Sequence, residues 1–301
     1  MSYVPKADIQ TGTMQINGKT IIAKDWIKTG LILSVIFMTG WISPKNPVDP
    51  WNLFSLKKII FMIFALAFIQ TLGLLMIQVL GSRLGAILTG FAGGLISSTA
   101  TTASLARNSI QSLKSDVATE NLTFLCATLA MLLEALAITV FGTEDVHSVL
   151  LVILLGPILA TVIMIIFQSQ ISTNQSPPLE NTRLDILPIL KLSAFIIGIL
   201  TFSKILQNIF GQSGLLALTF IMSLFEIHGS VIANVQLHDT GAITVQQLGG
   251  LLVISVAASY LSKLFLVFTL GSAVLKTTVA KSTAVLFFSL FSSWVIFRYL
   301  T

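Results

Sequence analysis

Charged residues are scarce in this sequence: Asp, Glu, Lys and Arg together make up 10% of the 301 residues, against 54% hydrophobic ones. The mean hydropathy is +0.92. A soluble domain of this length needs about a quarter of its residues charged to cover its surface. The composition therefore excludes an ordinary soluble domain and predicts an integral membrane protein.

Other absences exclude further classes. Cysteine occurs once, at Cys126, so no internal disulfide can form. The first 25 residues lack the basic start and immediate apolar core of a signal peptide, and no processing is expected. Basic residues form no run suited to a phosphate backbone, so no nucleic-acid partner is expected. No nucleophile motif such as G-x-S-x-G occurs, so neither an enzyme activity nor a cofactor is expected.

Long uncharged runs are what the sequence has in abundance. A transmembrane helix needs about 20 mostly apolar residues, and helices are expected because lipid offers no partners to open backbone groups. The fold class predicted is all-α, with nine crossings at 26–43, 59–80, 84–106, 121–141, 148–167, 187–209, 214–235, 249–271 and 282–299. With nine crossings, Lys and Arg are divided equally between the two faces, so they predict no orientation.

An internal repeat is suggested by a shift of 129 residues, which places 90–142 on 219–271 without a gap. The same shift carries crossing 59–80 onto 188–209 and 148–167 onto 277–296. The predicted organisation is a polar segment 1–25, a leading helix and loop 26–56, a first membrane repeat 57–167, a polar linker 168–186 and a second repeat 187–301. If each unit crosses four times, the repeats are parallel, related by an axis along the membrane normal. An inverted pair would need a re-entrant segment.

The stretch GFAGGLISSTATTASLAR, residues 90–107, is unusually rich in hydroxyls and glycines for a crossing. Gly90 and Gly94 are spaced as G-x-x-x-G, which lets helices approach closely. Gly93, and Gly229 in the second unit, are assigned to helix packing with them. The hydroxyl groups are candidates to line a pathway.

Two charges inside predicted crossings correspond under the shift. Glu134 lies in the first unit and Lys263 in the second. Charges at membrane depth cost about 2.5–3.5 kcal/mol each on insertion scales and normally find a partner. We expect the two side chains to form an ion pair or to share one polar cavity; the alternative is that each snorkels or binds a neighbouring backbone group.

The second unit also carries Glu226 and His228 in a crossing, with Glu226 matched to Ser97 by the shift. A carboxylate and an imidazole at membrane depth are typical of proton relays and cation pathways. The alternative is a purely structural role, in which Glu226 and His228 form hydrogen bonds with adjacent helices. Two candidate ligands do not make a specific metal signature, so no metal is assigned.

The favoured function is a membrane transporter or channel for a small ion or solute, with its pathway between the repeats. The residues predicted to line that pathway are Ser97, Ser98, Thr99, Thr101, Thr102, Glu226, His228, Ser230 and Asn234. The other class considered is a non-transporting membrane protein that binds and modulates another one. The partners expected are the lipid bilayer, a small ion or solute, and either a second copy of the chain or another membrane protein.

Three stretches carry a resemblance to a known family: PVDPW at 47–51, LGSRLGAILTGFAGGLISSTATTASLAR at 80–107, and LFEIHGSVIANVQLHDTGAIT at 224–244, followed by a helix with Lys263. The chain resembles a domain-of-unknown-function family of bacterial and archaeal multi-pass membrane proteins, often fused behind an MgtC/SapB domain. The resemblance implies a location in the bacterial inner membrane and hints at ion homeostasis. Similar proteins tend to carry an arginine in place of Glu134 and Asp-x-Asp in place of Glu226 and His228.

Overall fold

The computed structural model describes residues 6–8, 13–16, 19–44, 56–80, 85–111, 116–143, 148–170 and 213–301. The predicted crossing 187–209 and most of the predicted linker 168–186 lie outside these residues. The helices are α1 (Ala23–Ile42), α2 (Leu56–Leu80), α3 (Ala86–Gln111), α4 (Val117–Gly142), α5 (Ser148–Ser169), α7 (Ile227–Asp239), α8 (Val245–Leu270) and α9 (Ala273–Leu300). A further helical segment, Ser213–Phe225, directly precedes α7.

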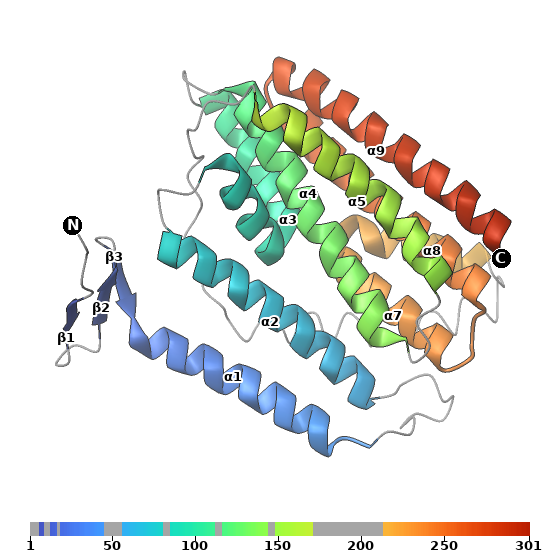
Figure 1. The fold of residues 1–301 in the computed structure, drawn as a ribbon, viewed down its shortest axis with the longest axis horizontal. Helices are drawn as coiled ribbons and strands as arrows, with labels where there is room; N and C mark the ends of the chain where they lie inside the picture. The colour runs from blue at the N-terminus through green and yellow to red at the C-terminus, as the bar shows by residue number, and fades with distance from the viewer. Residues whose placement is uncertain are drawn as a thin grey trace.

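A small antiparallel sheet departs from the predicted all-α fold. Strands β1 (Lys6–Asp8), β2 (Thr13–Ile16) and β3 (Lys19–Ile22) follow one another in sequence order. Thr13 pairs with Ile22 and Ile16 with Lys19, on either side of an Asn-Gly dipeptide that favours a two-residue hairpin turn. The segment 1–25 was predicted only to be polar, and it leads directly into α1 (Figure 1).

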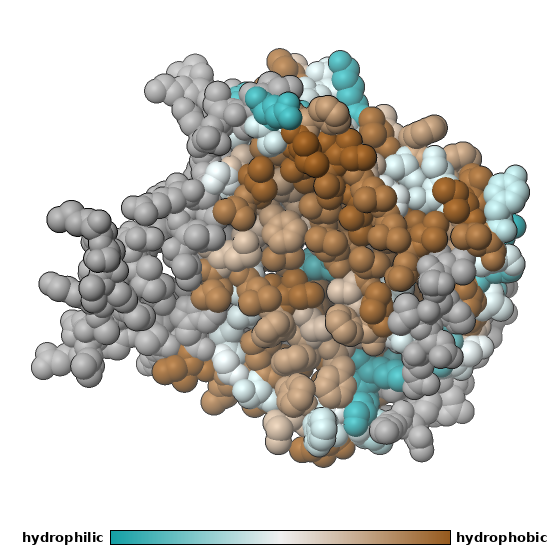
Figure 2. All heavy atoms as spheres, in the orientation of Figure 1, coloured by the Kyte–Doolittle hydropathy of each residue, from teal (hydrophilic) through white to brown (hydrophobic). Residues whose placement is uncertain are grey.

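Five of the described helices are long and apolar enough to cross a membrane: α2, α4, α5, α8 and α9. Large hydrophobic side chains are exposed along their outer faces, including Phe68, Leu159, Phe265 and Phe288. Figure 2 shows a broad area of such side chains, with hydrophilic ones mainly toward its edges. The chain is therefore a multi-pass α-helical protein of the lipid bilayer, which confirms the coarse prediction.

Helices α5 and α9, which the 129-residue shift makes equivalent, pack side by side and run in opposite directions (Figure 1). Near the start of α5, Ile153 lies beside Gly249, against which Phe297 from the end of α9 also packs. Near the end of α5, Ile165 packs against the cluster that holds Leu275 from the start of α9. The prediction of parallel repeats is therefore wrong, because parallel units would place equivalent helices in the same direction.

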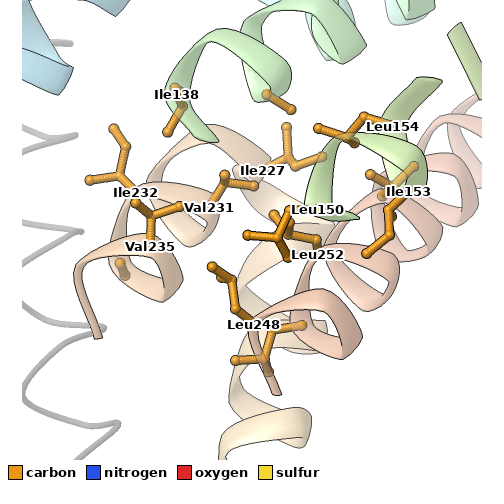
Figure 3. Packing of buried hydrophobic residues seen from close by; sticks show 14 of the residues in the cluster. Ile138, Leu150, Ile153, Leu154, Ile227, Val231, Ile232, Val235, Leu248 and Leu252 are labelled. Carbon is orange, nitrogen blue, oxygen red and sulfur yellow. The ribbon is translucent and has the colours of Figure 1, made fainter. Parts of the chain in front are cut away.

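The main hydrophobic core is built around α7, whose residues from Ile227 to Leu237 are all buried. Figure 3 shows Val231 and Val235 of α7 among Ile138 of α4, Leu150 of α5 and Leu252 of α8. A 13-residue helix is too short to span the hydrocarbon core, which needs about 20 residues. Helix α7 is therefore enclosed by the spanning helices and shielded from lipid.

Candidate functional site

Helix α3 is interrupted at Ser97, whose backbone is extended (φ −167°, ψ 103°). Before the break, Ala86 packs in a cluster with Leu122 and Cys126 of α4. After it, Leu105 and Ala106 pack with Phe124 and Leu125 of the same helix. In one continuous helix Ala86 and Ala106 would lie about 30 Å apart. Because both contact the same turns of α4, α3 folds back on itself as a hairpin with its tip at Ser97, here called the first hairpin.

The segment 213–239 folds in the same way around Glu226, which has φ −150° and ψ 105° between two helical arms. The Thr219 hydroxyl donates a hydrogen bond to Asn234 Oδ1 at 3.3 Å across the two arms. Residues 15 positions apart in a straight helix are separated by about 22 Å. The contact therefore requires a hairpin with its tip at Glu226, here called the second hairpin.

The two tips lie 129 residues apart, at positions matched by the sequence shift. Each tip residue caps the arm that follows it: Ser97 Oγ accepts from the Ala100 N–H at 3.2 Å, and Glu226 Oε1 accepts from the His228 N–H at 3.0 Å. The predicted crossings 84–106 and 214–235 are thus wrong as single spans. Their length and composition resemble a crossing, but one extended residue midway reverses the chain.

Glycine lets the first hairpin lie directly on α4. A Cβ at Gly90 would fall 2.5 Å from Thr123 O, and one at Gly94 would fall 2.6 Å from Ala127 Cα. Both neighbours are backbone atoms, which cannot move aside. Gly93 and Gly229 are also buried. The G-x-x-x-G spacing therefore lies in a close helix contact, at the positions predicted for packing.

At the tip of the second hairpin, the His228 imidazole lies between two carboxylates. Nδ1 is 2.8 Å from Glu226 Oε1, and Nε2 is 3.0 Å from Glu134 Oε2 on α4. The contact to Glu134 has ion-pair distance, although its angle falls short of a hydrogen bond. The Glu134 side chain is 1% exposed, whereas that of Glu226 is 41% exposed. The three side chains thus form a chain from an accessible carboxylate to a buried one.

Lys263 of α8 is fully buried beside this group. Its ammonium donates to Ser259 Oγ at 2.7 Å and contacts Met131 Sδ at 2.8 Å. It interacts electrostatically with both Glu134 and Glu226. Among the described side chains, Glu134 and Lys263 make no direct ion pair, because His228 takes the ion-pair position beside Glu134. Of the two predicted arrangements, the direct ion pair is absent, and the two charges instead belong to one buried polar cluster.

Several buried polar atoms on the second hairpin have no hydrogen-bond partner in the described part of the chain. They include Ser223 Oγ, Ser230 Oγ, Asn234 Nδ2 and both terminal atoms of the Gln236 amide. Each such group costs about 1–3 kcal/mol if it stays unsatisfied. Buried polar atoms are normally paired with protein, water or a ligand. The second hairpin therefore offers unoccupied hydrogen-bonding capacity within the membrane-spanning body.

The structure divides the predicted pathway residues between the two hairpins. Ser97 is at the first tip, and the residues that follow it on the second arm of α3 are Ser98, Thr99, Thr101 and Thr102; Thr102 donates to the Ser98 carbonyl at 2.7 Å. Glu226 is at the second tip, followed by His228, Ser230 and Asn234. Thr99 and Ser97 are half-buried, and Ser98, Thr101 and Thr102 are buried.

Sequence reasoning did not identify Thr219, Met131 or Ser259 as members of this centre. Thr219 and Asn234 lie at almost equal distances along the chain from Glu226, and that symmetry is the one sequence signal of the hairpin contact. Met131 and Ser259 carried no signal, because a thioether and a hydroxyl are common in membrane helices. They are recognised only once α8 is packed against α4, where Ser259 and Lys263 of α8 contact Met131 of α4.

Fold and site together define a multi-pass helical membrane protein with two helix hairpins and a buried cluster of ionisable side chains. The chain belongs to the family described as Domain of unknown function (DUF4010), whose model matches residues 65–271. That range contains both hairpins together with Glu134 and Lys263. No curated protein and no solved structure matches the chain.

Proposed function

We propose that this protein is a transporter or channel for a small ion or solute, with its path between the tips of the two hairpins. The observation that carries the proposal is the pair of helices interrupted at matched positions, with polar groups at both breaks. Interrupted helices at membrane depth are tolerated where they are buried in protein or line a water-filled cavity. Transporters commonly bind substrates and coupling ions at such breaks.

The proposal includes two inverted repeats, related by an axis in the membrane plane. Three observations support this relation. The first hairpin packs on α8 while α7 packs on α4, which are equivalent contacts when the units are exchanged. Helices α5 and α9 run in opposite directions. A unit made of one hairpin and an odd number of crossings also ends on the opposite face of the membrane from the one where it begins. The unit that follows it is therefore inverted.

The opposing reading is a membrane protein that binds and modulates another one, as an MgtC-like factor in ion homeostasis would. Close packing at Gly90 and Gly94 suits either function. Unpaired buried amides and a cluster of four ionisable side chains contribute little to packing and carry a desolvation cost. They favour transport. Since the sequence resembles bacterial and archaeal proteins, the proposal places the chain in the bacterial inner membrane.

The test is ion flux into proteoliposomes, with a panel of cations, anions and protons offered to wild type and to Glu226→Gln. We expect flux of at least one ion in wild type and its loss in the variant. Glu120→Gln is the matched control, because Glu120 is a second buried carboxyl, on α4 about 21 Å from Glu134 along the helix. If folded wild-type protein moves none of these ions, the modulator reading is favoured.

A further inference from the structure

We propose that Glu226, His228 and Glu134 form a relay that binds one proton and passes it between the accessible tip of the second hairpin and the interior of the protein. The use of that proton as the ion coupled to transport rests on the function proposed above. The proton-binding site itself does not, because it follows from the arrangement of the three side chains.

The arrangement favours proton sharing because both ring nitrogens face a carboxylate oxygen, at 2.8 and 3.0 Å. A neutral imidazole carries one N–H and can donate to only one of them. Two carboxylates around one imidazole therefore call for an additional proton, held on the ring or on one of the acids. A site whose complete hydrogen bonding needs one more proton than a neutral ring supplies is a proton-binding site.

The two ends of the relay differ in access. The Glu226 side chain is 41% exposed at the hairpin tip, and in the proposed relay it is the end that takes up a proton from outside the protein. The Glu134 side chain is 1% exposed, neither of its oxygens has a hydrogen-bond partner among the described residues, and Oε2 lies 3.0 Å from His228 Nε2. Among the described residues, the imidazole is the group that lies between them. In the proposed relay, a proton that enters at Glu226 reaches Glu134 through His228.

The transfer conserves atoms and charge. With Glu226 protonated, Glu134 ionised and the ring hydrogen on Nε2, the Glu226 proton moves to Nδ1 while the Nε2 hydrogen moves to Glu134 Oε2. Glu226 is left ionised, Glu134 protonated and the ring neutral in its other tautomer. No bond between heavy atoms changes. Ring rotation or proton exchange then resets the tautomer.

Among the described residues, the charged groups that interact with the relay form one balanced set. Helix α4 contributes Glu134, α8 contributes Lys263, and the second hairpin contributes Glu226 and His228. With both acids ionised, the ring protonated and the amine charged, the set is neutral. From α2, Lys58 reaches α7 at Asp239, about 16 Å along the helix from His228. One proton gained or lost therefore changes the net charge of the centre by one unit.

A metal ion is the competing ligand for carboxylates and imidazole. Among the described residues, no three His, Cys, Asp or Glu side chains are arranged to hold one. The two acids lie on opposite sides of the ring, with carboxylate oxygens 2.8 and 3.0 Å from its two nitrogens. This geometry suits a proton shared along the three side chains.

The first experiment measures the site without transport. The chain has three histidines, so His147→Gln with His238→Gln leaves His228 as the only imidazole for nitrogen NMR in detergent micelles. We expect its titration midpoint to fall by about one pH unit or more in Glu134→Gln and in Glu226→Gln, a tenfold loss of proton affinity. We expect a rise in Lys263→Gln and no change in the control Glu120→Gln. An unchanged midpoint in both glutamate variants would overturn the relay.

The second experiment measures proton movement in phosphatidylethanolamine–phosphatidylglycerol vesicles that contain a pH-sensitive dye. After an acid pulse, in the presence of each ion of the panel, we expect proton uptake that falls about tenfold or more in His228→Gln. If ion flux occurs but is indifferent to His228→Gln and to the pH gradient, the relay is wrong and the proposed function survives. If no ion crosses while the NMR midpoints move as expected, the proposed function is wrong and the proton-binding site stands.

Discussion

At the scale of single residues, the two glutamates of the central cluster share one imidazole and differ in access. Glu226 is an N-cap residue at a hairpin tip, where the chain changes direction and fewer neighbours surround the side chain. Glu134 lies in the interior of a continuous helix that neighbouring helices cover. The difference between them is set by backbone position and not by chemistry.

This difference predicts a contrast in thiol labelling. Cys126 is the single native cysteine and is buried, so Cys126→Ala gives a background without thiols. In that background we expect Glu226→Cys to react with a water-soluble, membrane-impermeant thiol reagent about tenfold or more faster than Glu134→Cys, since reaction requires an exposed thiolate. Rates are read by mass shift in proteoliposomes. Equal rates would show that the tip is not open to water.

The sequence singled out all four ionisable residues of the centre but placed them in two separate groups, Glu134 with Lys263 and Glu226 with His228. Glu134, Glu226, His228 and Lys263 were all predicted from the cost of burying charge in a membrane. The shift matched Glu134 with Lys263, and opposite charges at matched positions suggested a direct pair. In the structure Glu134 is paired with His228 instead, because the second hairpin packs on α4 and places His228 beside Glu134. The 129-residue correspondence between the two units does not show which helix each hairpin packs against.

At the scale of elements, each hairpin depends on close backbone contact. The first arm of α3 approaches α4 through glycines such as Gly94. Helix α8 carries a glycine that makes no close contact, Gly250, where an added methyl group would meet nothing within 4 Å. The same substitution therefore has opposite consequences at the two sites.

We expect Gly94→Ala to destabilise the protein by about 1–3 kcal/mol, because the new methyl group would meet the Ala127 backbone. Gly250→Ala is the control and should be neutral or slightly stabilising, since alanine is the better helix former by about 1 kcal/mol. Thermal unfolding in detergent measures both variants. Equal melting temperatures would mean that α3 does not lie against α4 in this way.

An engineered disulfide tests the fold of the second hairpin. Without Cys126, Thr219→Cys with Asn234→Cys should oxidise readily, since the two side chains meet across the arms at 3.3 Å. Leu252→Cys with Val267→Cys has the same spacing along the continuous helix α8, where the two sites lie about 22 Å apart, and should not cross-link. Mobility on non-reducing gels reports the bond. Failure of the first pair under conditions that preserve folding would exclude the hairpin.

Hydropathy could not have shown these hairpins. Ser97 and Glu226 interrupt their helices without a proline, and only one residue at each tip is extended. Hydropathy located the helical regions of the described part of the chain to within about five residues at most of their ends, but it merged Ser213–Phe225 and α7 into one crossing and missed the break in α3. Helix α9 begins at Ala273, well before the predicted 282, because its first part carries Lys276 and Lys281 and so extends beyond the uncharged run.

At the scale of the whole molecule, the hairpins alter which loops share a face. Both ends of the first hairpin lie at the same end of α4, and the Ser272 N–H between α8 and α9 donates to Ser109 Oγ at that end. The opposite end carries Thr143 and the end of the second hairpin, where Gly142 packs on Val235. Two faces are thus defined by contacts among the described residues.

Single cysteines in the Cys126→Ala background test this topology. We expect Gly85→Cys and Asp116→Cys to be labelled from one side of the membrane and Thr143→Cys from the other. Four full crossings per unit would place Gly85 and Asp116 on opposite sides. Impermeant reagent added before and after vesicle permeabilisation distinguishes the two arrangements.

The same topology predicts an unequal division of positive charge. With α1 counted as a crossing, one face would carry, among the described residues, Lys6, Lys19, Lys24, Lys28, Arg107, Lys276 and Lys281, against Lys57, Lys58 and Arg298 on the other. An excess of Lys and Arg marks the cytoplasmic side. The labelling experiment in whole cells should therefore find Gly85→Cys and Asp116→Cys on the cytoplasmic face.

The contacts of the hairpins with both halves also have a consequence for biosynthesis. The first hairpin packs on α8 as well as on α4, and α7 packs on α4 as well as on α8, so each half of the chain helps to enclose a polar segment of the other. During translation, the first hairpin is made more than a hundred residues before Lys263 and must wait for its covering helix. The polar centre can therefore assemble only after most of the chain has left the ribosome, and neither half made alone can complete it.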